Sequence, residues 1–195
     1  MGQKNVAARR MKLLAPFVGL AFLAAGCAHP SRETFDLAIA PDAAQVFVGG
    51  PAIGVREPMA MAPTSSDRIV VRDVDGSVAL LPGAQWSAPL PRLLRARIIE
   101  ALQRRGVAAA RVCGGSNRAL ATDVRRFEID VARSVAVVEI ASFIVEEVSG
   151  ATRTAKTFVV ERPTLGRTDA SAASALAGAA SEALAQMADW ARGRR

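Results

Sequence analysis

The chain has 195 residues, of which 51% are hydrophobic and 22% are charged. This length holds one domain, and the composition is that of a globular protein rather than a disordered one. The net charge of +7 would suit a nucleic-acid-binding protein, but Lys4, Arg9, Arg10 and Lys12 all precede Cys27. Removing these four from the 25 Lys and Arg leaves 21 basic side chains against 18 acidic ones. The basic excess therefore belongs to a targeting segment, and no nucleic-acid partner is predicted.

Residues 1–26 have the pattern of a signal peptide. A basic start is followed by an uncharged apolar run from Leu13 to Leu23, and small residues then precede Cys27. The apolar run is much shorter than the roughly 20 residues that span a bilayer as a helix, so a cleaved export signal is predicted. Either Met1 or Met11 can be the start, because the segment from Lys12 onward still forms a complete signal.

Residues 23–27, Leu-Ala-Ala-Gly-Cys, resemble the lipobox of bacterial lipoproteins, with Ala24 where Leu is usual. The resemblance implies cleavage after Gly26, a diacylglyceryl group on the Cys27 thiol and acylation of the new amine. Residues 27–33 would then form a lipidated tether. Ala28, rather than Asp, follows the cysteine, and by resemblance to sorting rules in Gram-negative cells this favours the periplasmic face of the outer membrane. The alternative is a plain secretory signal with an incidental cysteine.

The first half of the mature chain predicts short strands. The alternating apolar side chains of residues 34–40 predict a strand, and residues 46–48 and 53–55 are short apolar pieces separated by Gly49-Gly50-Pro51. Residues 58–66 show no periodicity and are predicted to be a loop. Asp75-Gly76 separates the apolar stretches 69–74 and 78–81, which predicts a tight β-hairpin.

A helix is predicted after Trp86, with Ser87 as its N-cap, Pro89 in the first turn and Gly106 at its end. Its apolar stripe is formed by Leu90, Leu93, Leu94, Ile98 and Leu102. Arg92 and Arg95 lie off this stripe, where they would either form a solvated face or contact an anionic lipid or an acidic partner.

The second half predicts three strands, at residues 120–132, 135–148 and 153–161, and an Ala-rich helix over Asp169–Arg192. Phe127, Ile129 and Val131 share one face of the first strand, but Val124 breaks the alternation, so a bulge is expected near Arg125-Arg126. The 135–148 strand is apolar on both faces and is predicted to be central.

These elements predict an α+β fold with a mainly antiparallel or mixed sheet and two major helices packed on one of its faces. Trp86 is expected to pack between helix and sheet. Trp190 is equally consistent with packing and with a partner contact, because exposed Trp is often a binding hot spot.

Three segments carry a family resemblance. They are Arg-Ile-Val-Val-Arg at 68–72, Gln-Trp-Ser-Ala-Pro-Leu at 85–90, and Leu-Ala-Thr-Asp-Val-Arg-Arg-Phe-Glu at 120–128. Together with the lipobox and the terminal helix containing Trp190, they resemble the ABC-type transport auxiliary lipoprotein family, which includes the PqiC-like lipoproteins that accompany MCE-domain transport systems. The resemblance runs from about Thr34 to Trp190, so residues 34–193 are predicted to form the domain.

The sequence offers little for catalysis. Its only histidine, His29, lies in the tether, where a general base could not be held rigidly. With Cys27 acylated, Cys113 has no disulfide partner and is expected to be a small apolar residue at a strand end. Glu146 and Glu147 are adjacent, so on a strand they point to opposite faces. We predict no enzymatic activity, no metal site, and no cofactor beyond the lipid on Cys27.

Two functions remain. The resemblance implies a non-enzymatic accessory subunit that docks an MCE-domain protein and helps to move lipids or lipophilic compounds between inner and outer membranes. Candidate partner contacts are Arg92, Arg95 and Trp190. The alternative is an envelope-assembly lipoprotein that binds cell-wall enzymes or outer-membrane complexes. Either is compatible with a homo-oligomer.

Overall fold

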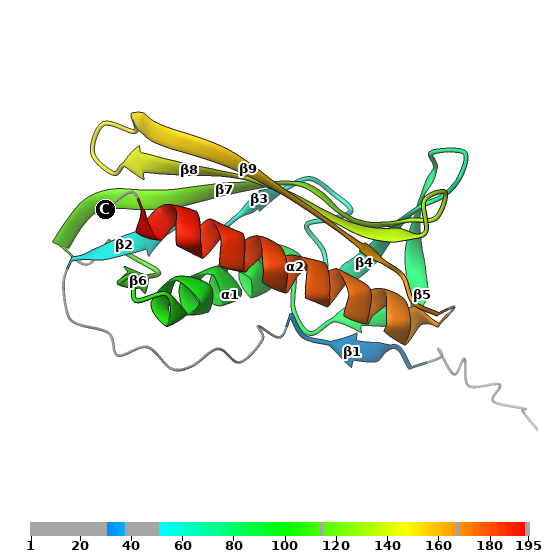
Figure 1. The fold of residues 1–195 in the computed structure, drawn as a ribbon. Helices are drawn as coiled ribbons and strands as arrows, with labels where there is room; N and C mark the ends of the chain where they lie inside the picture. Colours follow the sequence, from blue (N-terminus) through cyan, green and yellow to red (C-terminus); the bar gives the residue numbers. More distant parts are fainter. Residues whose placement is uncertain (1–30, 38–50, 114, 167, 194–195) are drawn as a thin grey trace, which may run out of the picture.

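The computed structural model describes residues 31–37, 51–113, 115–166 and 168–193. It shows one mixed β-sheet with two helices on the same face, which confirms the predicted fold class (Figure 1). The predicted signal peptide, Cys27, His29 and the expected piece at 46–48 lie outside the described residues.

The longest strands of the sheet are three consecutive antiparallel ones: β7 (Gly115–Asp130), β8 (Val135–Glu146) and β9 (Thr152–Pro163). The middle strand β8 is buried on both faces, as its sequence predicts. The bulge in β7 is also confirmed, because the register with β8 shifts between Val124 and Arg126. It leaves Phe127 and Ile129 in the core. Val131 is a correction: the strand ends at Asp130, and Val131 is exposed in the following turn.

The other edge of β7 receives three short parallel strands: β2 (Ala52–Val55), β3 (Met59–Ala60) and β4 (Arg68–Arg72). Beyond them, β6 (Ala109–Ala110) pairs with β2, and β5 (Val78–Trp86) pairs with β4. The expected loop at 58–66 therefore contains a strand. Its two residues hydrogen-bond to β7, a partner more than 60 positions away that local periodicity cannot reveal.

The β4–β5 hairpin is confirmed, and its turn is closed by hydrogen bonds from Asp73 N to Ser77 O and from Gly76 N to Asp73 O, each 2.9 Å. Gly76 has φ +85°, a conformation that favours glycine. Strand β5 is longer than predicted. Its register with β4 skips residues 81–84, which include Pro82 and Gly83, and the strand then continues because residues 84–86 pair with β1.

Strand β1 (Glu33–Phe35) runs parallel to the end of β5. The strand expected at 34–40 is thus shorter within the described residues, although Leu37 is buried as its pattern requires. Residues 38–40 lie outside the described part of the chain.

Helix α1 (Leu90–Arg104) begins later than predicted, and its N-cap is Pro89 rather than Ser87. A side-chain cap is unnecessary here because Pro91 has no N–H and Leu90 N donates to Ser66 O at 3.0 Å. The predicted stripe is confirmed: all five of its members are buried. Gly106, with φ +72°, follows the last turn as predicted.

Helix α2 (Asp169–Arg192) begins and ends where its sequence predicts, with a capping box between Thr168 and Ser171. Much of its buried face consists of alanine, so the helix can lie close to β8 and β9. Trp86 is fully buried and meets Phe127 edge to face, with ring centroids 5.8 Å apart, which confirms its predicted packing. One hydrophobic core joins both helices to the sheet.

Replacing Leu94 with Ala should lower the free energy of unfolding by roughly 2–5 kcal/mol, because the side chain is fully buried in this core. The matched control is Val148→Ala, an apolar truncation at a site 89% exposed, which should change stability by less than about 0.5 kcal/mol. Urea unfolding followed by tryptophan fluorescence measures both. Equal effects of the two variants would show that α1 does not bury this stripe.

Candidate functional site

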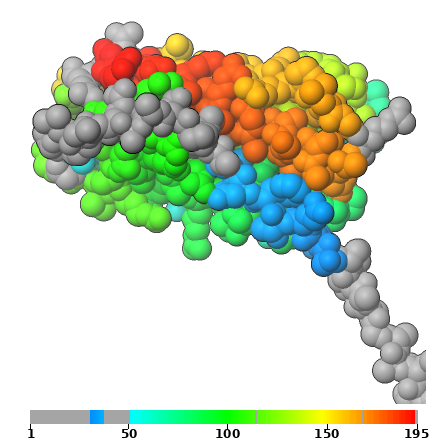
Figure 2. Space-filling model, turned by 60° about the horizontal axis from the view of Figure 1, so that its bottom comes forward, coloured from blue at the N-terminus to red at the C-terminus, as the bar shows by residue number. Residues whose placement is uncertain are grey.

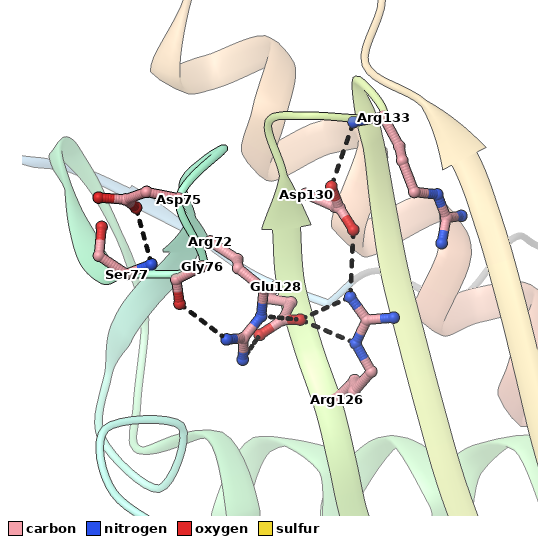
Figure 3. Close-up of polar contacts among 8 residues, drawn as sticks. All are labelled: Arg72, Asp75, Gly76, Ser77, Arg126, Glu128, Asp130 and Arg133. Carbon is pink, nitrogen blue, oxygen red and sulfur yellow. Dashed lines mark hydrogen bonds and ion pairs between the residues drawn. The ribbon is translucent and has the colours of Figure 1, made fainter.

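The face of the sheet opposite the helices, here called the outer face, carries a network of charged side chains. Alternation along β7 sends Phe127 and Ile129 into the core and therefore Glu128 and Asp130 to the outer face. Figure 3 shows these carboxylates with Arg126 on β7 and Arg72 on β4.

Glu128 lies at the centre of the network, with a side chain only 5% exposed. Arg72 donates to both of its carboxylate oxygens, Nε to Oε1 and Nη2 to Oε2, each at 2.9 Å. Arg126 donates from Nε to the same Oε1 at 2.8 Å. This bidentate pairing joins the parallel strands β4 and β7 through side chains as well as backbone.

The network also fixes two turns. Arg72 Nη1 donates to Gly76 O at 3.2 Å in the β4–β5 turn. Asp130 Oδ1 accepts from Arg133 N at 3.1 Å in the β7–β8 turn, and its Oδ2 lies 3.3 Å from Arg126 Nη2. Arg133 in turn forms an ion pair with Glu161 on β9.

Burial by itself raises the pKa of Glu128, but the hydrogen bonds and positive charges of Arg72 and Arg126 outweigh it, so the pKa lies below its ordinary value. The hydrogen bond and charge of Glu128 raise the pKa of Arg72. Glu128 is thus held as a paired anion. A carboxylate in this state is a poor general acid or base.

Two buried valines lie beside the network. Val70 on β4 and Val137 on β8 are the residues opposite Glu128, so they lie on the outer face. They are nevertheless only 2% and 0% exposed. The aliphatic stems of paired arginines can shield such valines while their charged ends remain hydrated.

The two predicted arginines of α1 differ. Arg92 is exposed. Arg95 is held by hydrogen bonds from Nε to Val55 O at 2.8 Å and from Nη2 to Arg111 O at 2.6 Å, and its side chain is 20% exposed. The expectation that both guanidinium groups face solvent is therefore corrected for Arg95, which joins α1 to β2 and to the segment after β6.

Trp190 lies at the edge of the core, half-buried, with its ring edge to face with Phe158 at a centroid distance of 5.9 Å. Part of its surface remains accessible for a contact. Cys113 is half-buried, and its Sγ donates to Arg118 O at 3.3 Å. A Cβ added to Gly54 would lie 2.5 Å from that sulfur, so the thiol packs directly on β2.

The adjacent Glu146 and Glu147 do not form a carboxylate pair. Glu146 forms an ion pair with Arg153, whereas Glu147 pairs with Arg56 at 3.2 Å. Across the described ranges, no group of three or more His, Cys, Asp or Glu could hold a metal ion. Neither described helix combines the length and the apolar character needed to cross a bilayer.

Two hollows lie on the surface of the domain. One, of about 340 Å³, is lined by Arg118, Ile144, Arg153 and Thr154 at the far end of β8 and β9. The other, of about 470 Å³, lies at the first turns of α2 and is lined in part by Arg162, Leu165 and Ser174. Both are shallow surface features, and nothing in their linings indicates a reaction.

The family can now be assigned. A sequence model described as ABC-type transport auxiliary lipoprotein component matches residues 35–189, most of the chain. The chain belongs to this family. Membership confirms the resemblance in the sequence and puts the chain among membrane-anchored lipoproteins that serve ABC-type transport and therefore have partner subunits.

Solved structures agree with this assignment. Protein XCC0632 from Xanthomonas campestris is 26% identical, with a TM-score of 0.69, over 82% of this chain and 94% of that one. An uncharacterized protein has the same fold, with 15% identity and a TM-score of 0.67 over 82% of this chain and 97% of its own. No curated protein matches the chain.

The Glu128 network predicts a pH-dependent stability. At neutral pH, Glu128→Gln should lower the free energy of unfolding by roughly 1–3 kcal/mol, because it weakens charge-assisted hydrogen bonds while the half-exposed arginines can still reach water. Glu139→Gln is the control: Glu139 lies 3.6 Å from the exposed Arg125, and its loss should cost less than about 1 kcal/mol.

Because the folded-state pKa of Glu128 is lowered, its stabilisation is present above the unfolded-state pKa of about 4.3 and is lost as the pH falls through the folded value. The difference between the wild-type chain and Glu128→Gln should therefore shrink below about pH 4. Urea titrations from pH 7 to pH 2 measure it. A difference that stays constant over this range would contradict the paired-anion assignment.

Proposed function

We propose that this auxiliary lipoprotein is attached to the outer membrane, on its periplasmic face, through lipid on Cys27. In this proposal it is a non-enzymatic subunit of an MCE-type ABC system that moves lipids or lipophilic compounds between the two membranes. The observation that carries the proposal is the family match over residues 35–189 directly after a lipobox.

The described side chains support an accessory role without chemistry. The most buried carboxylate, Glu128, is neutralised by two arginines, and the sole histidine belongs to the tether. Catalysis would need a free acid, base or nucleophile held next to a substrate. The only attached group we propose is the lipid on Cys27.

A docking role needs an accessible surface on a rigid element, and α1 offers one. Arg92 is exposed on a helix whose opposite side is fixed in the core, and the internal contacts of Arg95 anchor the same helix to β2. We therefore propose Arg92, with the accessible part of Trp190, as contacts for the MCE-domain subunit, and we assign Arg95 mainly to positioning this helix.

Cys27→Ser should leave an unprocessed precursor without lipid label, because a hydroxyl is a poor acyl acceptor. Metabolic labelling with palmitate and membrane fractionation measure this. Cys113→Ser is the matched control and should be processed normally, since that thiol is engaged within the domain. Normal acylation of Cys27→Ser would exclude the lipoprotein anchor at this position.

Arg92→Glu should reduce co-purification of an MCE-domain subunit from detergent-solubilised membranes while leaving the free energy of unfolding within about 0.5 kcal/mol. Arg125→Glu, an exposed reversal on the outer face, should retain the partner. Mass spectrometry identifies the proteins recovered, and the mass of the isolated assembly gives the number of copies. Recovery of cell-wall enzymes without any MCE-domain protein would favour an envelope-assembly function instead.

A further inference from the structure

One end of the domain is formed by three turns and by the start of β1. The β4–β5 turn, the β7–β8 turn and the connection from β9 to α2 all lie at the right of Figure 1, where β1 also begins. Hydrogen bonds join them: Val131 N donates to Arg72 O at 3.0 Å, and Thr164 N donates to Ser134 O at 3.0 Å. We call this region the tether end.

The tether end is also fixed to β1. Gly83 N on β5 donates to Asp169 Oδ2 in the first turn of α2 at 2.5 Å, and the next residue, Ala84, pairs with Glu33 of β1. Figure 2 shows β1, in blue, beside the N-terminal half of α2, in orange. The chain therefore enters the domain at this end.

Each of the three turns carries an exposed apolar side chain, while Met59, Met61, Val112, Val148 and Val159 are exposed elsewhere. Val74 is 72% exposed, Val131 is 42% exposed and Leu165 is 83% exposed, one in each of the three turns. Val78 and Leu80, on the part of β5 next to the first turn, are 48% and 39% exposed. Apolar side chains grouped on a surface mark a contact with a partner or a membrane, whereas isolated ones need no explanation.

The short tether determines which end of the domain is held near the membrane. Ser31, the first described residue, comes four positions after Cys27. A fully extended chain spans at most about 3.6 Å per residue, so the lipidated residue lies within roughly 14 Å of the domain surface. Strand β8, with 12 residues, is about 40 Å long, so its two ends cannot be equally close to the bilayer unless the domain lies flat.

The turns are suited to the headgroup region. In the β4–β5 turn, backbone donors are satisfied internally: Val74 N donates to Asp73 Oδ1 at 2.7 Å, and Ser77 N donates to Asp75 Oδ1 at 2.8 Å. An apolar tip can then enter the interface without exposing unpaired N–H groups to it. The β4–β5 turn carries Asp73 and Asp75, whereas Arg133 lies in the β7–β8 turn and Arg32 precedes β1, so the charges of this end are mixed and favour zwitterionic phospholipid over a strongly anionic surface.

We infer that the tether end lies against the phospholipid surface, with Val74, Val131 and Leu165 in the interfacial region, so that the domain stands on the membrane in one orientation. This inference rests on the proposed lipid anchor at Cys27. It adds a second, non-covalent membrane contact, which orients the lipidated chain and directs the β8–β9 turn away from the bilayer.

The test uses the full-length acylated chain with Cys113→Ser, so that a single new thiol can carry an environment-sensitive nitrobenzoxadiazole label. Labels are placed at Leu165→Cys and Val74→Cys, and the matched control is Val148→Cys, an equally exposed apolar site in the β8–β9 turn. Each protein is reconstituted in phosphatidylcholine vesicles that contain lipids with spin labels on the acyl chains.

Quenching at positions 165 and 74 should exceed quenching at position 148 by roughly threefold, because an interfacial apolar side chain reaches about 5–10 Å into the boundary between headgroups and acyl chains, close to the spin labels. Equal quenching at all three sites in an acylated chain overturns the inference and leaves the proposed function standing. A blue shift at 165 and 74 that is not quenched by labelled lipid indicates a second copy or another protein, and also overturns it. Mass spectrometry of the N-terminal peptide separates these results from loss of the anchor: a chain without acyl groups overturns both proposals.

Discussion

Within the described residues the two helices cover only one face of the sheet, so in this part of the chain the outer face has no second layer and must be stable in water. A bare row of valines there would be an aggregation surface. Instead, charged side chains on β4 and β7 alternate with the core residues, and Arg72 and Arg126 converge on Glu128. Val70 and Val137 stay buried beside that carboxylate. Strand β7 pairs with β8 on one side and with β2, β3 and β4 on the other. The charged network keeps this part of the outer face polar where no helix covers it.

The sequence predicts an element correctly where its ends are determined by neighbouring residues. The end of α1 at Gly106, the Asp75-Gly76 turn and the limits of α2 depend on capping and turn residues a few positions apart. The elements that were missed depend on distant partners. Strand β3 exists because Met59 and Ala60 meet β7, and the start of α1 moves to Leu90 because Ser66, 24 residues earlier, accepts its N–H. The parallel pairing of β2, β3 and β4 with β7 depends on how the chain is connected in space, so the hydrophobic periodicity of each segment does not reveal it.

The same distinction holds for the functional residues. A lipobox is a short contiguous motif, and the family resemblance lay in contiguous segments. On a helical projection Arg92 lies opposite the apolar stripe, whereas Arg95 lies at its edge, next to Leu102. Arg95 also reaches the carbonyls of Val55 and Arg111, which come from other elements and are not visible in the helix sequence. The Glu128 network did leave a signal: Arg126, Glu128 and Asp130 alternate with Phe127 and Ile129. This period of two indicates that the three charged side chains lie on the face opposite Phe127 and Ile129, which is the outer face.

The bulge in β7 has a consequence for how chains of this fold can differ in length. Elsewhere in the meander, deleting one residue would exchange the core and outer faces of everything that follows in the strand. At Arg125 the extra residue has no partner of its own in β8, so its removal would bring Val124 and Arg126 into regular alternation and keep Phe127 inside and Glu128 outside. A single-residue gap between related sequences is therefore expected at this position of the strand rather than at its neighbours. An alignment that places the gap one or two residues away would assign the core and the ion network to the wrong faces.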